Sequence, residues 1–313
     1  MIGAGQPGLP LPVAALLGPT ASGKSALGLR LAEQLEGEII CCDSMQVYRG
    51  MDIGTAKATP AERAAVPHHL LDVVSPAEQF HAAAWAAAAR TLVVDINARG
   101  RLPIIVGGTG LYFRALVCGL FDAPRPAPEI RARHQAEAAV AGPAALHARL
   151  QSIDPESATK IEPGDLVRIS RALEVFEQTG KTISELRRTQ ARPTPSMRVF
   201  SLALDFDLSL LRRRIATRVA GMMAAGFLDE VRGLRDSGYR GSRAMQGIGY
   251  KQLSEHLDGE GDLARAVVSI ESATAAYARR QRTWFRREAI SLRLHEPPGA
   301  ETIVQLLRDW LAA

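Results

Sequence analysis

The chain has 313 residues, 47% hydrophobic and 23% charged, a mixture typical of a globular protein with a sizeable core. No run approaches the roughly 18 apolar residues that a membrane helix needs, and the Gly/Pro-rich residues 1–12 lack the basic start of a signal peptide. Three cysteines are too few for a disulfide framework. We therefore expect a cytoplasmic protein without membrane contacts.

The net charge of +5 favours a polyanionic partner without identifying it. Two groups of arginines stand out, at positions 212–214 with 218, and at positions 279, 280, 282, 286 and 287. Each group forms either a solvated helix face or a surface for a polyanion, and the sequence leaves both readings open.

An apolar segment at residues 13–17 runs directly into a glycine-rich loop with the pattern G-x-x-x-x-G-K-[ST]. The loop consists of Gly18, Pro19, Thr20, Ala21, Ser22, Gly23, Lys24 and Ser25. Between a strand and a helix, here expected at 26–35, such a loop turns backbone N–H groups toward phosphates, while its lysine adds positive charge and its serine hydroxyl binds Mg²⁺. We expect a diphosphate or triphosphate site; the loop alone does not identify the compound.

The remaining strand-like segments predict an α/β fold. They lie at residues 38–42, 102–106 and 199–204 and alternate with helical stretches. This pattern is typical of a P-loop NTPase-like parallel sheet with helices on both faces.

The pattern changes between residues 120 and 196. Prolines at 124, 126 and 128 precede helical stretches at 130–141, 143–152 and 165–178, and no convincing strand occurs there. We predict a helical insertion at 121–197 with a return linker at 192–195. The core is then built from 1–120 and from 198–313.

Polar residues follow the second predicted strand in the order Asp43, Ser44, Met45, Gln46. We expect this strand to lie next to the strand of the phosphate loop, which would place Asp43 close to Ser25. Asp43 is then a Mg²⁺ partner, a general base or a turn cap. Ser44 and Gln46 could hydrogen-bond the edge of a nucleobase.

The third predicted strand runs into Gly107, Gly108, Thr109 and Gly110. Thr109 either caps the following helix or faces substrate. The strand lacks the terminal aspartate of a hydrolytic Walker B segment, which weakens an ATPase interpretation. The histidine pair at 68–69 has no obvious further ligands nearby, so we expect structural packing and no metal.

Two helices after residue 199 carry informative stripes. Leu211, Ile215, Val219 and Met222 predict one apolar face, and Arg218 directly precedes Val219. Arg218 therefore lies at the border between buried and wet surface, where an arginine can reach into a cleft. A second, long helix is expected at 263–288, with Val267, Ile270, Thr274, Tyr277, Gln281 and Trp284 along one side.

Several motifs in the same order resemble those of the bacterial tRNA dimethylallyltransferase (tRNA isopentenyltransferase) family. They span residues 18–25, 43–48, 52–57, 107–112, 171–175, 246–251 and 280–286. The resemblance implies transfer of a dimethylallyl group from dimethylallyl diphosphate to N6 of the adenosine 3′-adjacent to the anticodon, with release of pyrophosphate. It implies Mg²⁺ as the cofactor, the tRNA anticodon stem-loop as the partner and, we expect, a monomer.

The resemblance also implies residue roles. Asp43 would be the general base and Thr109 would orient it; Lys24 and Arg218 would neutralise the leaving diphosphate, with Ser25 as the Mg²⁺ ligand. Contacts to tRNA would come from Asp43, Ser44, Met45, Gln46, Thr109, Arg131, Arg168, Ile169, Ser170, Arg171, Gly249, Tyr250 and Lys251. The alternatives are a P-loop small-molecule or nucleoside kinase, and a non-catalytic RNA-binding module.

Overall fold

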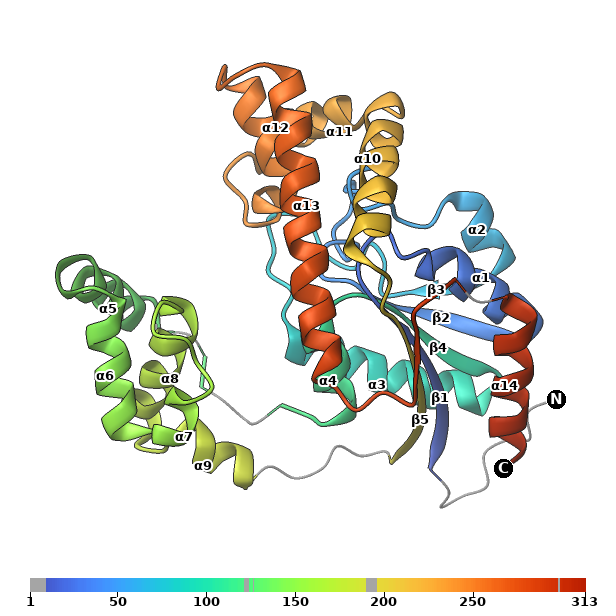
Figure 1. Ribbon diagram of the computed structural model, residues 1–313, viewed down its shortest axis with the longest axis horizontal. Coiled ribbons are helices and arrows are strands. Elements are labelled where there is room, and N and C mark those ends of the chain that lie inside the picture. The colour runs from blue at the N-terminus through green and yellow to red at the C-terminus, as the bar shows by residue number, and fades with distance from the viewer. Residues whose placement is uncertain (1–9, 121–123, 126, 190–195, 298) are drawn as a thin grey trace. The chain divides into compact units, whose positions relative to one another are not determined.

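The computed structural model describes residues 10–120, 124, 125, 127–189, 196–297 and 299–313 (Figure 1). It divides the chain into two compact units, one of residues 1–117 and 193–313 and one of residues 118–192. Residues 1–9, Pro126 and the expected return linker at 192–195 lie outside the described residues. A strand begins at Met197, inside the stretch that we assigned to the insertion.

The first unit is built on six parallel strands in the order β3-β2-β4-β1-β5-β6. Their bounds are β1 (Leu11–Leu17), β2 (Gly37–Cys42), β3 (His68–His69), β4 (Leu102–Gly107), β5 (Met197–Leu204) and β6 (Leu292–Leu294). The four predicted strands are confirmed. We missed β3 and β6, because segments of two and three residues carry no periodic signal.

Helices cover both faces of this sheet, as predicted (Figure 1). One face packs against α1 (Lys24–Gln34), α10 (Leu208–Ala224), α11 (Phe227–Leu234), α12 (Tyr250–Leu257) and α14 (Ala300–Ala312). The other packs against α3 (Ala82–Ala98) and α4 (Gly110–Val117). Shorter helices of this unit are α2 (Pro60–Ala65), η1 (Arg235–Tyr239) and η2 (Ala244–Gln246).

The long helix α13 (Leu263–Arg286) contributes to both hydrophobic clusters, through Ile270 to the first and through Phe285 to the second. It therefore passes from one side of the sheet to the other. Along the described residues, no helix combines the length and apolarity that crossing a bilayer requires.

The topology brings three loops to one edge of the sheet. The phosphate loop follows β1, the Gly107–Thr109 segment follows β4 and Asp43 follows β2. Our expectation that β2 neighbours β1 is wrong, because β4 lies between them. The carboxyl ends of all three strands still open on the same side of the sheet.

The second unit is helical, with α5 (Pro128–Ala141), α6 (Pro143–Ile153), α7 (Pro155–Ala158), α8 (Leu166–Thr179) and α9 (Ile183–Arg188). The helices α5, α6 and α7 each begin with proline, whose fixed φ and missing N–H suit the first helical position. Leu146, Leu150, Ile169 and Leu173 form the centre of a separate core. The unit therefore has its own hydrophobic cluster.

Candidate active site

The phosphate loop has the backbone that its glycines were expected to provide. Gly23 has a φ of 88° and is the N-cap of α1, whose first residues are Lys24 and Ser25 of the loop. A Cβ at Gly18 would lie 3.0 Å from the carbonyl oxygen of Leu204, so β5 leaves little room for a side chain there. Nζ of Lys24 donates to the carbonyl oxygen of Pro19 at 3.1 Å, within the same loop.

A second cation reaches this loop from α10. Burial, and then the positive charge of Arg218, lower the pKa of Lys24 to about 8, while Asp43 acts in the opposite direction. Burial likewise lowers the pKa of Arg218, again opposed by Asp43. Lys24, Arg218 and Asp43 therefore share one electrostatic environment. The mutual repulsion of the two cations favours binding of an anion between them.

Asp43 is fixed by the turn that follows β2. Its Oδ1 accepts the backbone N–H groups of Met45 at 2.8 Å and Gln46 at 3.3 Å. One carboxylate oxygen therefore acts as the turn cap that we considered. Within the described parts of the chain, Oδ2 has no hydrogen-bond partner, which leaves this oxygen free to accept a proton from a substrate.

Thr109 connects the ends of β2 and β4. Its Oγ1 accepts the N–H of Ser44 at 3.1 Å, and its own N–H donates to the carbonyl oxygen of Cys42 at 3.1 Å. A Cβ at Gly107 would lie 2.0 Å from the Cys42 oxygen, so this close approach requires glycine. Thr109 is thus a neighbour of Asp43 and holds the adjacent residue, while the structure shows no bond from Thr109 to the carboxylate itself.

The segment 52–57 supports two further site residues. Nε2 of Gln46 donates to the carbonyl oxygens of Thr55 at 3.1 Å and Ala56 at 3.2 Å. Nη2 of Arg218 donates to the same Thr55 oxygen at 3.4 Å. Because the amide nitrogen of Gln46 is engaged, its Oε1 is the atom left for contact with a base edge.

Helix α13 supplies two residues that we did not assign to the site. Gln281 bridges two loops, since its Oε1 accepts the N–H of Thr20 at 2.8 Å and its Nε2 donates to the Gly108 carbonyl at 2.9 Å. Burial and the charge of Asp43 raise the pKa of Tyr277 to about 12, against a hydrogen bond with Thr109. Both are polar residues on the buried stripe of the helix, which was the available signal.

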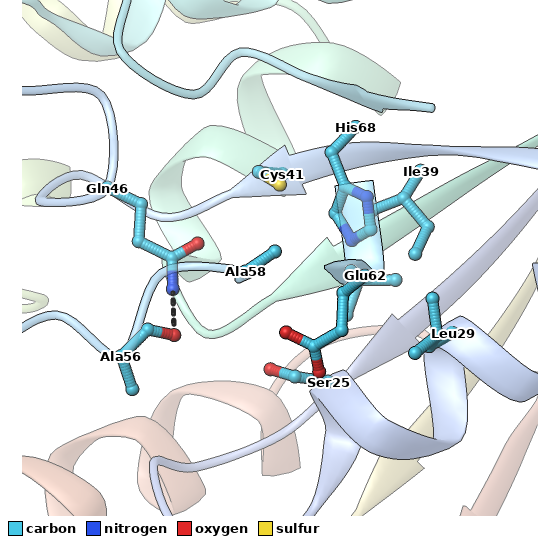
Figure 2. Close-up of a pocket in the computed structure, with 10 residues that line it drawn as sticks. Ser25, Leu29, Ile39, Cys41, Gln46, Ala56, Ala58, Glu62 and His68 are labelled. Carbon is cyan, nitrogen blue, oxygen red and sulfur yellow. Dashed lines mark hydrogen bonds between the residues drawn. The ribbon is translucent and has the colours of Figure 1, made fainter. Parts of the chain in front are cut away.

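A cavity of about 70 Å³ lies beside the first turn of α1 (Figure 2). It is lined by Ser25, Leu29, Ile39, Cys41, Gln46, Ala56, Ala58, Glu62, His68 and Val106. No group of three or more His, Cys, Asp or Glu side chains that could hold a metal ion occurs among the described residues. Mg²⁺ in phosphate sites typically takes only one or two protein ligands, so the single hydroxyl of Ser25 fits such a role.

The histidine pair has the packing role that we expected. His68 hydrogen-bonds the carbonyl oxygen of Val66 through Nδ1 at 2.8 Å. His69 bonds Glu38 through Nε2 at 2.7 Å, beside Arg99. Both side chains therefore form hydrogen bonds that support β3 at the edge of the sheet.

Some members of the two arginine groups have a structural role that neither of our two interpretations included. Arg214 donates to the carbonyl oxygen of Ser22 at 3.1 Å and so supports the phosphate loop. Arg282 and Arg286 form ion pairs with Asp205 at 2.6 and 3.0 Å, which fastens α13 to the end of β5. The exposed members are Arg212, Arg213, Arg279, Arg280, Arg286 and Arg287.

The predicted tRNA contacts near residue 250 require a correction. The side chain of Tyr250 is buried, packs edge-on against Phe227 and donates its hydroxyl to Glu230 at 2.7 Å. It is therefore part of the core. Gly249 has a φ of 91°, and its neighbour Lys251 keeps 52% of its side chain exposed. Lys251 is the side chain of this group that can reach a phosphate.

In the helical unit, two of the three predicted arginines share one buried carboxylate. Arg131 and Arg171 both pair with Glu174, which is fully buried. Burial acts to raise the pKa of Glu174, but hydrogen bonds from Arg171, the Ala127 N–H and Arg131 outweigh it and lower the pKa. Arg168 pairs with Asp165 at the helix start and stays 63% exposed.

The side chains of Ile169 and Ser170 face the core of the helical unit, which corrects our prediction for them. Ile169 is fully buried, and Oγ of Ser170 hydrogen-bonds Nδ1 of the buried His134 at 2.9 Å. Their side chains are therefore unavailable to RNA, and only their backbone atoms could take part in a contact.

Comparison with known proteins identifies the family. The IPP transferase family matches residues 46–288. A tRNA dimethylallyltransferase of Roseiflexus sp. (strain RS-1) is 47% identical over 310 residues, which is 97% of this chain and 100% of the relative. Another, of Anaeromyxobacter dehalogenans, is 50% identical over 271 residues, 87% of this chain and 90% of the relative.

Two solved structures of proteins with related names resemble this chain. A tRNA isopentenylpyrophosphate transferase of Bacillus halodurans has a TM-score of 0.69 at 36% identity and covers 96% of this chain and 97% of that chain. A eukaryotic dimethylallyltransferase, described as acting on tRNA, has a TM-score of 0.80 at 27% identity and covers 96% and 79%. The chain therefore belongs to the tRNA dimethylallyltransferase family.

Proposed function

We propose that this enzyme transfers a dimethylallyl group from dimethylallyl diphosphate to N6 of the adenosine 3′-adjacent to the anticodon in tRNA, releasing pyrophosphate. The observation that carries the proposal is the electrostatic environment that Lys24 of the phosphate loop shares with Arg218 of α10 and the carboxylate of Asp43. Family membership supports the reaction type.

The diphosphate of the donor binds at the phosphate loop, where the N-terminus of α1 and the two cations attract it. Charge on the leaving oxygen increases as the C–O bond breaks. Lys24 and Arg218 are already in place to stabilise that charge, so their contribution grows toward the transition state. Mg²⁺, held by Ser25 and the diphosphate, would neutralise further negative charge on the leaving group.

The acceptor reacts at the exocyclic N6 of adenine. As the new C–N bond forms, N6 must lose a proton, and Oδ2 of Asp43 accepts it. The backbone N–H groups that bind Oδ1 fix the orientation of this carboxylate. Thr109 acts indirectly by holding the N–H of Ser44.

The target adenine must leave its stack in the anticodon loop to reach this edge of the sheet. Ser44, Met45 and Oε1 of Gln46 are half-buried groups that could contact it. Arg168 and Lys251 offer exposed positive charge for tRNA phosphates. We further propose a cytoplasmic location, in keeping with a tRNA substrate.

A nucleoside kinase would use the same loop, but membership of a prenyl-transferring family favours the proposed reaction. The experiment that tests it incubates the protein and Mg²⁺ with unmodified tRNA and either dimethylallyl diphosphate or ATP. We expect the mass of a dimethylallyl group on adenosine with the first donor only. Phosphate transfer from ATP without prenylation would refute the proposal.

A further inference from the structure

The segment 52–57 has a backbone conformation that depends on contacts with other parts of the chain. Ala56 has a φ of 47°, a left-handed value that is unfavourable for a residue with a Cβ. A Cβ at Gly54 would lie 2.2 Å from the ring of Phe227, so the backbone there packs directly against α11. Two site side chains, Gln46 and Arg218, depend on carbonyl oxygens of this segment.

One carboxylate of α11 holds the start of the segment. Oε2 of Glu230 accepts the N–H groups of Asp52 at 2.9 Å and Ile53 at 2.7 Å, and Oε1 accepts the N–H of Gly54 at 3.1 Å. Three successive backbone N–H groups thus converge on one anion, an arrangement that binds negative charge well. Oε1 also accepts the hydroxyl of Tyr250 at 2.7 Å, which orients the carboxylate from α12.

The end of the segment is held separately. Nζ of Lys57, whose side chain is 1% exposed, donates to the carbonyl oxygen of Tyr48 at 2.8 Å and forms ion pairs with Asp52 and Asp72 at 2.5 and 2.6 Å. Hydrogen bonds to charged groups are stronger than neutral ones. Glu230 thus binds the start of the segment and Lys57 fixes its end, and the carbonyl groups of Thr55 and Ala56 lie between these two points in the sequence.

We propose that Glu230 is a positioning residue of this active site, which acts through the segment 52–57 to set the places of Arg218 and Gln46. Loss of its acceptor oxygens would release the Asp52–Gly54 N–H groups and let the Thr55 carbonyl move. Arg218 would then lose its only hydrogen bond among the described residues. The inference rests on the proposed function, because it takes Arg218 to bind the donor diphosphate.

The test uses Glu230→Gln in the full-length enzyme, which keeps the shape but places an NH₂ group against backbone donors. We expect the KM for dimethylallyl diphosphate to rise about tenfold, the effect of one lost charge-assisted hydrogen bond, with a smaller change in kcat. Hydrogen exchange of the amides of residues 52–54 should become faster. The control is Asp229→Asn, an exposed carboxylate on the same helix that pairs with Arg232.

An unchanged KM would overturn the inference, and so would a variant whose only change is a lower melting temperature. The double variant Glu230→Gln/Arg218→Ala gives a further test. If its fold-change in KM equals the product of the fold-changes of the two single variants, Glu230 does not act through Arg218 and the inference fails. If Glu230→Gln does not fold, Glu230→Asp retains the charge and should raise the same KM by withdrawing the oxygens from the segment. Wild-type enzyme is measured first, so that a failure of prenyl transfer itself is recognised separately from a failure of Glu230→Gln to alter it.

Discussion

The core unit and the helical unit both contain arginines that we assigned to function, but they use them differently. In the core unit, the charges of Arg218 and Lys24 act on each other and on Asp43, and Arg218 forms no ion pair among the described residues. In the helical unit, Arg131 and Arg171 share the buried Glu174. A cation left with another cation attracts an anionic ligand, whereas a cation paired with a buried carboxylate stabilises the fold.

The difference shows that the partner of a basic side chain, more than its place in a motif, indicates what it does. Arg168 is intermediate, since it is exposed and pairs with Asp165 in water, where an ion pair is weak and easily exchanged for a phosphate. The comparison therefore predicts distinct effects for changes in each unit.

The largest effect is expected for Asp43→Asn. The asparagine oxygen can still accept the N–H of Met45, so the turn persists while the base is lost. We expect kcat to fall about 10²- to 10⁴-fold with tRNA affinity retained. Single-turnover kinetics and filter binding measure the two, with Asp95→Asn on the exposed side of α3 as the control. Retained turnover would disprove the assignment of the base.

The next effect is expected for Arg218→Ala. Removing a pre-positioned cation from the diphosphate site should lower kcat/KM for the donor about 10²-fold. Arg212→Ala, an exposed change on the same helix, should leave it unaltered. If both variants lose activity equally, Arg218 has no special role and the contrast between the units fails.

Lys24 predicts a pH dependence. Its pKa is lowered to about 8 in the free enzyme, and a bound diphosphate raises it, so binding above pH 8 requires uptake of a proton. Affinity for the donor should be constant below pH 8 and fall up to about tenfold per pH unit above it. Lys24→Arg, which stays charged, should remove that decline. Identical pH profiles of the two proteins would contradict this.

Arg171→Ala should affect stability more than chemistry. Glu174 would keep Arg131 but lose one of its charged partners while remaining buried. We expect the free energy of unfolding to decrease by about 1–3 kcal/mol, with kcat/KM for the donor unchanged. Chemical denaturation measures the first quantity. If Arg171→Ala keeps its free energy of unfolding but has a lower kcat/KM for the donor, Arg171 acts in catalysis and not in stability, contrary to the comparison of the two units.

The smallest effect is expected for Arg168→Ala, which should raise the Kd for tRNA at most about fivefold and reduce the salt dependence of binding by about one ion. Lys160→Ala, exposed in the same unit and paired with Glu156, is the control. Titrations at several salt concentrations distinguish the two; equal salt slopes for Arg168→Ala and wild type would exclude a phosphate contact.

The sequence by itself determined the phosphate loop, the four main strands and the place of Arg218 at the border of a helical stripe. These features are local: a motif of eight residues, apolar runs and a period near 3.6 can all be read without knowing the contacts. The same locality explains why α5, α6 and α8 of the second unit were predicted at nearly their observed limits, whereas the short helices α7 and α9 were missed.

Only the tertiary structure decided the strand order, the buried state of Tyr250 and Ser170, and the pairing of Arg131 with Glu174. Each depends on residues far apart in the chain, such as Tyr250 with Glu230, or His134 with Ser170. The bridge from Gln281 to Thr20 crosses 261 residues. Hydrogen bonds and ion pairs of this kind have no period in the sequence, so they follow from packing alone.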